Sequence, residues 1–334
     1  MSELRRDPLV GRWVIVSTDN PTMPQSYEYE PHTWKGGTCP FCYGNESMTP
    51  PEIAVLREPG TGANTSGWHV RTVANKYPAL QIEGDLNRTG VGIYDMSNGI
   101  GAHEVIIESP YHNKDLCDLL NPEIENVLAM YCQRALDLIK DKRFKCILVF
   151  RNFGPAAGAS LEHPHTQIVA LPMVPKNVKE ELVGAHNYFE YRERCIFCDL
   201  LRQESQEKER IVVENKYFSA FCPFVSRFPF EIWILPKKHN CYFCHMAQEE
   251  IPALAAVLKE VLMKLKAVFP SLSYNMLIHS SPVNGDGNVD SYHWHIEIMP
   301  KLTRVAGFEW GTGFYVVPTP PEIAAKYLKE AKIS

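Results

Sequence analysis

Cysteine and histidine residues occur in this 334-residue chain at spacings that suit metal binding. Two Cys-x-x-Cys pairs are present, formed by Cys39 with Cys42 and by Cys195 with Cys198. This spacing lets two thiolates reach one tetrahedral ion from a tight turn, although a redox pair or two buried thiols would explain one pair taken alone. A third group, Cys241, Cys244 and His245, has no counterpart elsewhere in the chain. We therefore interpret these three as surface or packing residues.

Two histidine pairs follow a second pattern. His163 and His165 are followed by Gln167, and in the same way His293 and His295 are followed by Glu297. Alternate residues of a strand share a face, so each segment is expected to direct two imidazoles and one amide or carboxylate to the same side. One such triplet could be a polar strand face in water, but two triplets, each running into apolar residues and a proline, are hard to attribute to chance.

The two patterns belong to an internal duplication. The segments around Glu104 and Glu231, and the Asn-Lys-Tyr segments that start at Asn75 and Asn215, recur in the same order at slowly drifting spacing. Each copy then supplies two thiols and two imidazoles, the ligands of a closed structural zinc site. The predicted ligand sets are Cys39, Cys42, His112 and His163 in the first copy, and Cys195, Cys198, His239 and His293 in the second. We expect zinc at both, with iron as the alternative at one of them.

The elements that position these residues can be read from periodicity. Apolar residues recur at helical spacing after Asn121, which we expect to cap the helix, and again from Leu254 to Leu265. Short apolar strands are expected at 146–150 and 274–278, and a charged helix is expected between the copies at 178–194. The pattern predicts an α+β fold of two tandem units, 1–177 and 178–334, with a mostly antiparallel sheet and helices packed on it.

Composition excludes several functions. The formal net charge is -5 and 22% of residues are charged, so there is no basic field to hold a nucleic acid. No apolar run approaches the length of a membrane span, and the first residues lack the apolar core of a signal peptide. We expect a cytoplasmic protein without nucleic acid or membrane partners, whose ten cysteines are thiols or metal ligands.

The first histidine pair also suggests phosphorus chemistry. If His163 binds a metal, His165 is held beside a rigid anchor yet remains free to act as a nucleophile. The preceding small-residue loop, 152–160, could bring backbone N–H groups close to phosphate oxygens, while Ser160 and Gln167 could add donors. An ordinary turn would explain the loop alone, but its place directly before the histidine pair favours phosphate binding.

Together these segments resemble a known family. The run Phe150-Arg151-Asn152, then Gly158-Ala159-Ser160, then His163-Pro164-His165-Thr166-Gln167 is similar to the active-site signature of the galactose-1-phosphate uridylyltransferase family. That family is the transferase branch of the histidine-triad superfamily, and the resemblance covers nearly the whole chain. The Gly311-Thr312-Gly313 segment and the second Cys-x-x-Cys pair also resemble the ADP-glucose phosphorylases, which share the fold and the nucleophile.

The resemblance implies a ping-pong nucleotidyltransferase and a homodimer. His165 would attack the α-phosphorus of UDP-glucose, release glucose 1-phosphate and pass the uridylyl group to galactose 1-phosphate. The alternatives are phosphorolysis of ADP-glucose or adenylyl transfer at the same site, and a zinc-stabilised nucleotide-binding protein with little turnover. The residues that the resemblance assigns to catalysis are His165, Gln167 and Ser160, and those it assigns to substrate binding are Asn75, Asn152, Gly158, Ala159, Ser160, Gln167, Phe308 and Glu309.

Two features depart from the family pattern or divide the copies. Asn20 and Met23 stand where the family usually has nucleotide-binding arginines, so either another cation such as Arg5, Arg6 or Arg151 substitutes, the substrate differs, or activity is weak. In the second copy the small loop is replaced by the acidic segment 282–287, beside Glu297, which would repel phosphate. We therefore expect the second copy to be structural and to face the sugar.

Overall fold

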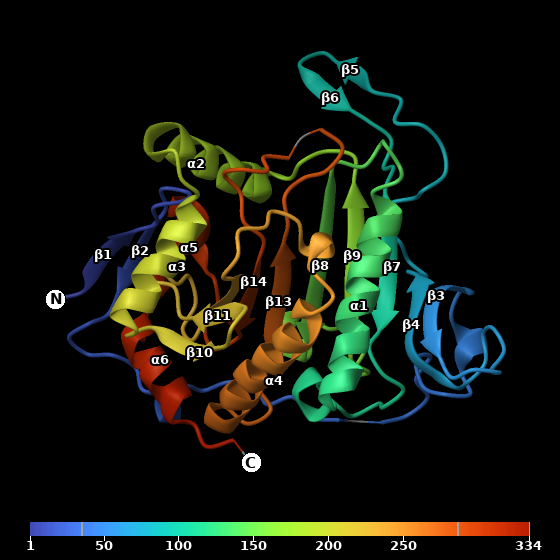
Figure 1. Ribbon diagram of the computed structural model, residues 1–334, viewed down its shortest axis with the longest axis horizontal. Coiled ribbons are helices and arrows are strands. Elements are labelled where there is room, and N and C mark those ends of the chain that lie inside the picture. Colours follow the sequence, from blue (N-terminus) through green and yellow to red (C-terminus); the bar gives the residue numbers. More distant parts are fainter. Residues whose placement is uncertain (35, 286, 334) are drawn as a thin grey trace.

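The computed structural model describes residues 1–34, 36–285 and 287–333. Asp286, which contributes to the predicted acidic loop, lies outside the described residues. The centre of the protein is one ten-stranded sheet (Figure 1), whose neighbouring strands are all antiparallel. From one edge to the other the strands are β10 (Ile211–Glu214), β11 (Phe218–Phe221), β12 (Ile232–Pro236), β14 (His295–Pro300), β13 (Tyr274–His279), β8 (Cys146–Phe153), β9 (His165–Leu171), β7 (Ala102–Ile107), β4 (Trp68–Ala74) and β3 (Glu52–Arg57).

The strand order displays the duplication. The first copy contributes β8, β9, β7 and β4, and the second contributes β13, β14, β12 and β11 in the same order outward from the middle. The copies meet where β8 pairs with β13, with Arg151 opposite Met276. The predicted α+β class and mostly antiparallel sheet are confirmed, and the two copies share one sheet.

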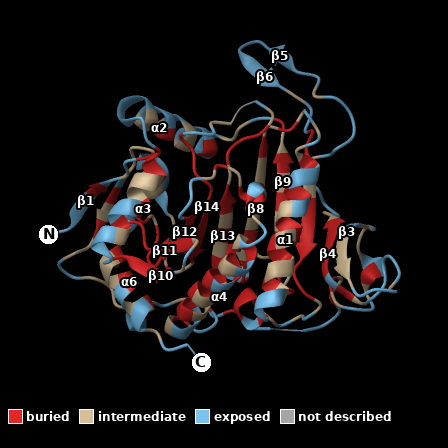
Figure 2. Cartoon of the chain, in the orientation of Figure 1, coloured by how far each residue is buried: buried red, intermediate tan, exposed pale blue. Residues whose placement is uncertain are grey.

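Two long helices, α1 (Asn121–Leu138) and α4 (Glu250–Val268), lie side by side across one face of this sheet (Figure 1). Their predicted apolar stripes, which include Ile124, Leu128, Leu254 and Leu258, are buried against it, as the red inner faces in Figure 2 show. The remaining helices are α2 (Lys176–Arg192), α3 (Ile196–Glu207), α5 (Gly307–Thr312) and α6 (Pro321–Glu330), with 3-10 turns η1 (Pro24–Ser26), η2 (Glu46–Met48), η3 (Leu116–Asp118), η4 (Pro155–Ala157) and η5 (Phe243–His245). In the described part of the chain, no helix is long and apolar enough to cross a membrane.

Two small sheets complete the fold. In the first, β1 (Glu3–Arg6) pairs with β2 (Trp13–Val16), which pairs in parallel with β15 (Tyr315–Val317). The beginning of the chain therefore packs beside its end, and Arg5 reinforces this contact with an ion pair to Glu322 at 2.9 Å. In the second, β5 (Thr89–Val91) and β6 (Tyr94–Met96) form a hairpin that projects from the body at the top of Figure 1.

Several predicted boundaries shift. Asn121 is the first residue of α1 rather than its cap; Leu120 holds the cap position and its N–H donates to Glu123 at 2.6 Å. The Asn-Lys-Tyr segments lie in turns after β4 and β10, because the Asn75 and Asn215 carboxamides accept the N–H two residues onward, each at 2.9 Å. The strand predicted at 146–150 continues to Phe153. The helix predicted between the copies is confirmed as α2.

Candidate active site and metal centres

The four predicted ligands of the first copy meet at one point. Their ligand atoms all lie within 4.8 Å of one another. The Cys42 thiol is 3.4 Å from His112 Nδ1 and 3.6 Å from His163 Nδ1. Ligand bonds of normal length around a tetrahedral zinc ion put sulfur and nitrogen about 3.6 Å apart. The separation and the donor set therefore both fit zinc.

The outer nitrogen of the His163 ring is held so that the inner one can bind a metal. His163 Nε2–H donates to the Ser109 carbonyl at 2.8 Å, which leaves the Nδ1 lone pair directed at the cluster. His112 Nε2 lies 3.7 Å from a Glu162 carboxylate oxygen. Burial lowers the pKa of His163 to about 4, so its imidazole is neutral, as a metal ligand must be.

The second cluster repeats this arrangement. Its four ligand atoms also lie within 4.8 Å of one another, and Cys198 Sγ is 3.5 Å from His239 Nδ1 and 3.6 Å from His293 Nδ1. His239 and His293 donate from Nε2 to backbone carbonyls at 2.8 and 2.9 Å. Cys241 and Cys244 are buried in the apolar core and are not part of either cluster, as predicted.

His165 is the first residue of β9, and His163 lies just before the strand. The strand therefore begins two residues later than predicted, but both imidazoles pack edge-on against Phe41 and a hydrogen bond connects the two residues. His165 Nδ1 lies 2.8 Å from the His163 carbonyl oxygen. A carbonyl can only accept, so Nδ1 carries the proton and Nε2 carries the lone pair. Burial lowers the pKa of His165, which keeps this nitrogen unprotonated near neutral pH.

His165 lines a cavity of about 410 Å³, which lies at the C-terminal end of β4 and over β7 and β9. Three other predicted site residues line it too: Asn75, Ser160 and Gln167. The remaining walls are largely apolar, with Phe41 packing edge-on against the His165 ring at 5.3 Å between centroids. A neutral imidazole, three polar side chains and an apolar surface thus occupy one hollow, the usual composition of a small-molecule site.

Other predicted substrate contacts lie outside this lining: Asn152, Gly158, Ala159, Phe308 and Glu309. Asn152 instead accepts a hydrogen bond from Asn275 Nδ2 at 2.8 Å, and the same Asn275 nitrogen donates to the Ala157 carbonyl at 2.9 Å. Phe308 and Glu309 belong to α5, where Glu309 accepts from the Ala306 N–H. Their roles as substrate contacts remain predictions.

The small-residue loop before His165 has a defined shape. Gly154 and Gly158 have φ values of 81° and 84°, which favour glycine. A side chain on Gly154 would also place its Cβ 2.2 Å from Ser273 Oγ. The loop is therefore packed against β13, and its backbone is fixed where it approaches Ser160.

Arg151, from the signature run, supports the site from behind. It pairs with Glu108 at 2.8 Å and with Asp115 at 2.9 Å, and it is almost fully buried. Glu108 in turn accepts from Thr166 at 2.6 Å, on the opposite face of β9 from His165 and Gln167. This buried network connects β9, the strand that carries His165, to its neighbours.

Two of the three substitutes suggested for the missing arginines are engaged elsewhere, and the third, Arg6, is an exposed residue of β1. Arg151 is committed to Glu108 and Asp115, and Arg5 to Glu322, so neither can move to a phosphate without breaking a buried ion pair. Among the described residues that line the cavity, Lys76 is the basic one. Met23 packs near the chain end instead, with its sulfur 3.7 Å from the Tyr327 hydroxyl.

The equivalent site in the second copy is filled. His295 is fully buried, stacked on His279 at 4.5 Å and on Trp233 at 5.0 Å. Glu297 is also buried, which agrees with a structural role for this copy, and the expectation that the copy faces the sugar stays a prediction. Glu181, His279 and His295 form a third group with metal-ligand chemistry, which the sequence did not suggest.

Charge pairing organises this third group. His279 lies 3.2 Å from both Glu181 and Glu297, and Arg227 lies 2.5 Å from Glu297. Burial alone would lower the pKa of His279, but the two carboxylates raise it to about 10. A protonated imidazole cannot coordinate a metal, so here the group acts as an ion-pair network.

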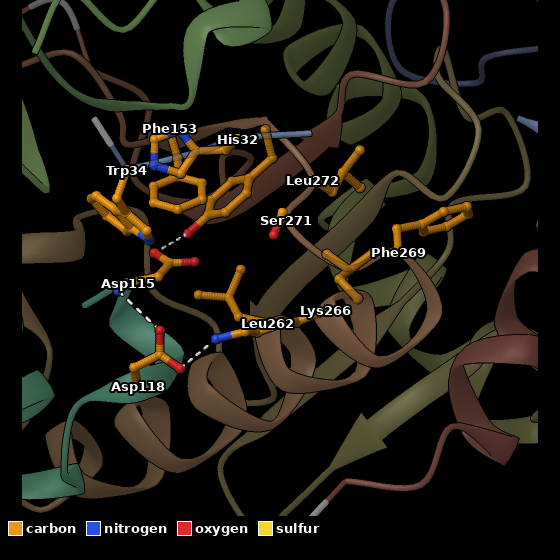
Figure 3. Close-up of a pocket in the computed structure, with 12 residues that line it drawn as sticks. His32, Trp34, Asp115, Asp118, Phe153, Leu262, Lys266, Phe269, Ser271 and Leu272 are labelled. Atoms are coloured by element: carbon orange, nitrogen blue, oxygen red, sulfur yellow. Dashed lines mark hydrogen bonds and ion pairs between the residues drawn. The ribbon is translucent and has the colours of Figure 1, made fainter. Parts of the chain in front are cut away.

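A second, smaller hollow of about 70 Å³ lies on the helix-covered side, between α4, η3 and the ends of β8 and β13. Figure 3 shows its aromatic walls, Trp34 and Phe153, and the Asp118–Lys266 ion pair at its rim. None of the predicted catalytic, binding or metal residues lines it.

Comparison with known proteins agrees with this geometry. The domain family described as galactose-1-phosphate uridyl transferase, N-terminal domain, matches residues 1–175, and the corresponding C-terminal domain family matches residues 181–318. The two halves of the chain thus correspond to the two domains of one family of uridyl transferases. The chain belongs to the galactose-1-phosphate uridylyltransferase family.

Individual relatives include proteins with two different names. An ADP-glucose phosphorylase of Arabidopsis thaliana is 36% identical over 99% of this chain and 93% of its own length. A galactose-1-phosphate uridylyltransferase of Thermotoga maritima is 32% identical over 100% and 99%. A crystal structure of the Arabidopsis thaliana ADP-glucose phosphorylase with bound ADP-glucose superposes with a TM-score of 0.84 at 35% identity, each chain being fully covered.

Proposed function

We propose that the protein transfers a nucleoside monophosphate group through a covalent intermediate on His165. The observation that carries the proposal is the fixed tautomer of His165: Nδ1–H is bound to the His163 carbonyl, so the Nε2 lone pair is available at the cavity. Attack forms a nitrogen–phosphorus bond at the α-phosphorus and breaks the bond to the bridging oxygen, so a sugar 1-phosphate leaves. The imidazolium formed keeps its Nδ1–H bond to a carbonyl, which stabilises its charge.

The second half-reaction returns His165 to its neutral state. A phosphate oxygen of the acceptor attacks the same phosphorus, and Nε2 leaves with its electron pair. For UDP-glucose as donor the acceptor would be galactose 1-phosphate, and the product UDP-galactose. Gln167 and Ser160 line the cavity at this point and would donate hydrogen bonds to the transferring group.

Phosphorolysis of ADP-glucose is the second candidate. It is favoured by the Arabidopsis thaliana relative, and it uses the same nucleophile with inorganic phosphate as acceptor and ADP as product. The apolar walls of the cavity accept either base.

The test uses UDP-glucose and ADP-glucose, each labelled with ³²P at the α-phosphorus and mixed with the purified protein. Acid-labile, base-stable label on the protein from one donor but not the other would support the proposal and identify the base. Binding of both nucleotides without label would instead support a zinc-stabilised binding protein with little turnover.

We further propose that zinc occupies both Cys2His2 clusters, with iron as the alternative at one. The sulfur–nitrogen separations and the backbone-bound outer nitrogens support this. Metal analysis of protein purified without chelator, finding neither zinc nor iron, would contradict it. Because each metal would hold the first histidine of a His-x-His pair, the first metal would fix the strand that carries His165 and the second the strand that carries His295.

The unit 1–177 is proposed as catalytic and 178–334 as its structural partner, in a cytoplasmic homodimer. The ten cysteines, four of them proposed metal ligands, are not paired in disulfides, which suits a reducing compartment. The hairpin of β5 and β6 exposes Val91, Ile93, Tyr94 and Met96, and an exposed apolar patch of this kind suits a protein contact. Sedimentation of the full chain and of an Ile93→Asp variant would test the dimer.

A further inference from the structure

His103 lies beside the candidate site and has no role in the argument so far. It is a residue of β7, where Val105 pairs with Gln167 of β9 and Ile107 pairs with His165. Side chains opposite one another in antiparallel strands share a face, and so do alternate residues of one strand. His103 therefore stands on the same face as His165 and Gln167.

Two hydrogen bonds determine the tautomer of the His103 ring. The Ala79 backbone N–H donates to His103 Nδ1 at 3.2 Å, so Nδ1 must carry the lone pair. In the neutral imidazole the proton is then on Nε2. Nε2 lies 2.7 Å from Gln167 Oε1, and this short contact is a hydrogen bond donated by His103.

This bond decides which end of Gln167 faces the cavity. A carboxamide has an acceptor end and a donor end, and rotation by half a turn exchanges them. With Oε1 held by His103, the NH2 group points away from His103 and is free to donate. Reversed, the amide would present its oxygen to the phosphate oxygens and repel them.

Asn75 is oriented on the other side of the same ring. Its Oδ1 accepts from the Tyr77 N–H at 2.9 Å, so its NH2 group is the end that lies 3.0 Å from His103 Nε2. Two donors cannot bond each other, so the His103 proton goes to Gln167, and the Asn75 protons remain available to the cavity that Asn75 lines.

We propose that His103 is a positioning residue that holds Gln167 with its amide N–H groups toward the transferring phosphoryl group. The inference rests on the proposed function, because it assigns a role through Gln167 in nucleotidyl transfer. His103 does not touch the reacting atoms in this assignment.

Three variants separate this role from a structural one. His103→Gln keeps an N–H near the position of Nε2, His103→Met has a similar length without a donor, and His103→Asn can accept from Ala79 but is too short to reach Gln167. The measurement is the maximal rate at which α-³²P donor labels the protein in a single turnover, together with the half-saturating donor concentration. Melting temperature and metal content control for folding.

We expect the Met and Asn variants to label about 10- to 100-fold more slowly, less than the roughly 10²- to 10³-fold lost when a transition-state donor is removed outright, because Gln167 is still present. Half-saturation should change far less, and His103→Gln should recover most of the rate. In a Gln167→Ala background, His103→Met should have little further effect, because its target is gone.

Two outcomes would overturn the proposal. One is wild-type labelling by both the Met and Asn variants. The other is a full additional loss when His103→Met is combined with Gln167→Ala, which would mean that His103 acts independently of Gln167. Failure of the proposed function is distinct, because then the wild-type protein itself would acquire no label.

Discussion

The two copies of the fold have the same internal connections and opposite surroundings. In each, a Cys2His2 cluster includes a histidine whose carbonyl accepts a hydrogen bond from the Nδ1–H of the histidine two residues later, at 2.8 Å in the first copy and 3.2 Å in the second. In the first copy that second histidine lines an open cavity. In the second it is covered by two aromatic rings and has no exposed surface.

The difference lies in what stands around the shared strand. Gln167 is neutral and faces a cavity, whereas Glu297 is charged and buried between His279 and Arg227. The metal cluster and the His-x-His connection are thus a structural unit that both copies need. Reactivity requires, in addition, that the strand face be left open and free of negative charge.

Removing the second histidine of each pair should give the largest contrast. His165→Gly is expected to reduce covalent labelling by at least about 10⁴-fold, as loss of a nucleophile does in other covalent enzymes. His295→Gly should leave His165 labelled but destabilise the fold, since it empties a packed site between Trp233 and His279. Quantifying label and metal in both variants tests this. Undiminished exchange between UDP-glucose and glucose 1-phosphate in His165→Gly would refute the assignment.

Substitutions in the two metal clusters should have similar effects, unlike the substitutions of His165 and His295. Cys39→Ser and Cys195→Ser are each expected to lose one metal ion and to lower the free energy of unfolding by several kcal/mol, because metal binding is coupled to folding. Metal analysis with urea unfolding would measure both effects. In each variant, the covalent labelling of His165 should change less than the free energy of unfolding. An unchanged metal content in either variant would remove that cysteine from the ligand set.

Local sequence patterns were sufficient for much of this architecture. The ligand sets could be predicted because duplication supplies each ligand twice in the same order, and the geometry of both clusters agrees with that prediction. The core helices could be predicted because their apolar spacing is regular over several turns. Both signals depend on repetition within the chain.

Contacts between distant segments could not be predicted in this way. Glu181 and His279 are 98 residues apart in the sequence, and nothing in either segment indicates that they meet. His103 was missed because it lies in an apolar strand whose pairing with β9 sets its neighbours. The departures at Asn20 and Met23 were visible, but only the packed structure shows that Arg5 and Arg151 are committed elsewhere.

Gln167 and Glu297 hold the same position in the two histidine segments, and exchanging amide for carboxylate at each should affect different properties: covalent labelling in the first copy and stability in the second. Gln167→Glu places a carboxylate in the cavity and is expected to slow labelling about 10²- to 10³-fold by removing a donor and repelling phosphate, with little change in unfolding. Glu297→Gln removes the carboxylate that Arg227 and His279 share, leaving them only Glu231 and Glu181, and should cost about 3–5 kcal/mol of stability while His165 is still labelled. If the two variants had the same effect, the copies would not differ as described.

The smallest expected effect is the pH dependence of stability that His279 of the second copy adds. The carboxylates of Glu181 and Glu297 raise the pKa of His279 to about 10, above the value of about 6.5 in an unfolded chain. A group whose pKa is raised by folding stabilises the fold fully below its unfolded pKa, and this stabilisation is lost as the pH rises toward 10. His279→Gln keeps the side chain polar but removes the charge. The stability difference between wild type and variant should therefore be greatest near pH 6 and shrink by at most about 1.4 kcal/mol for each pH unit above 6.5. Urea unfolding at pH 6, 8 and 9.5 measures this, with the exposed His245→Gln as control for loss of an imidazole. A stability difference between wild type and variant that stayed constant across the range would show that His279 is neutral in the folded protein. The group would then be a candidate metal site instead of an ion-pair network.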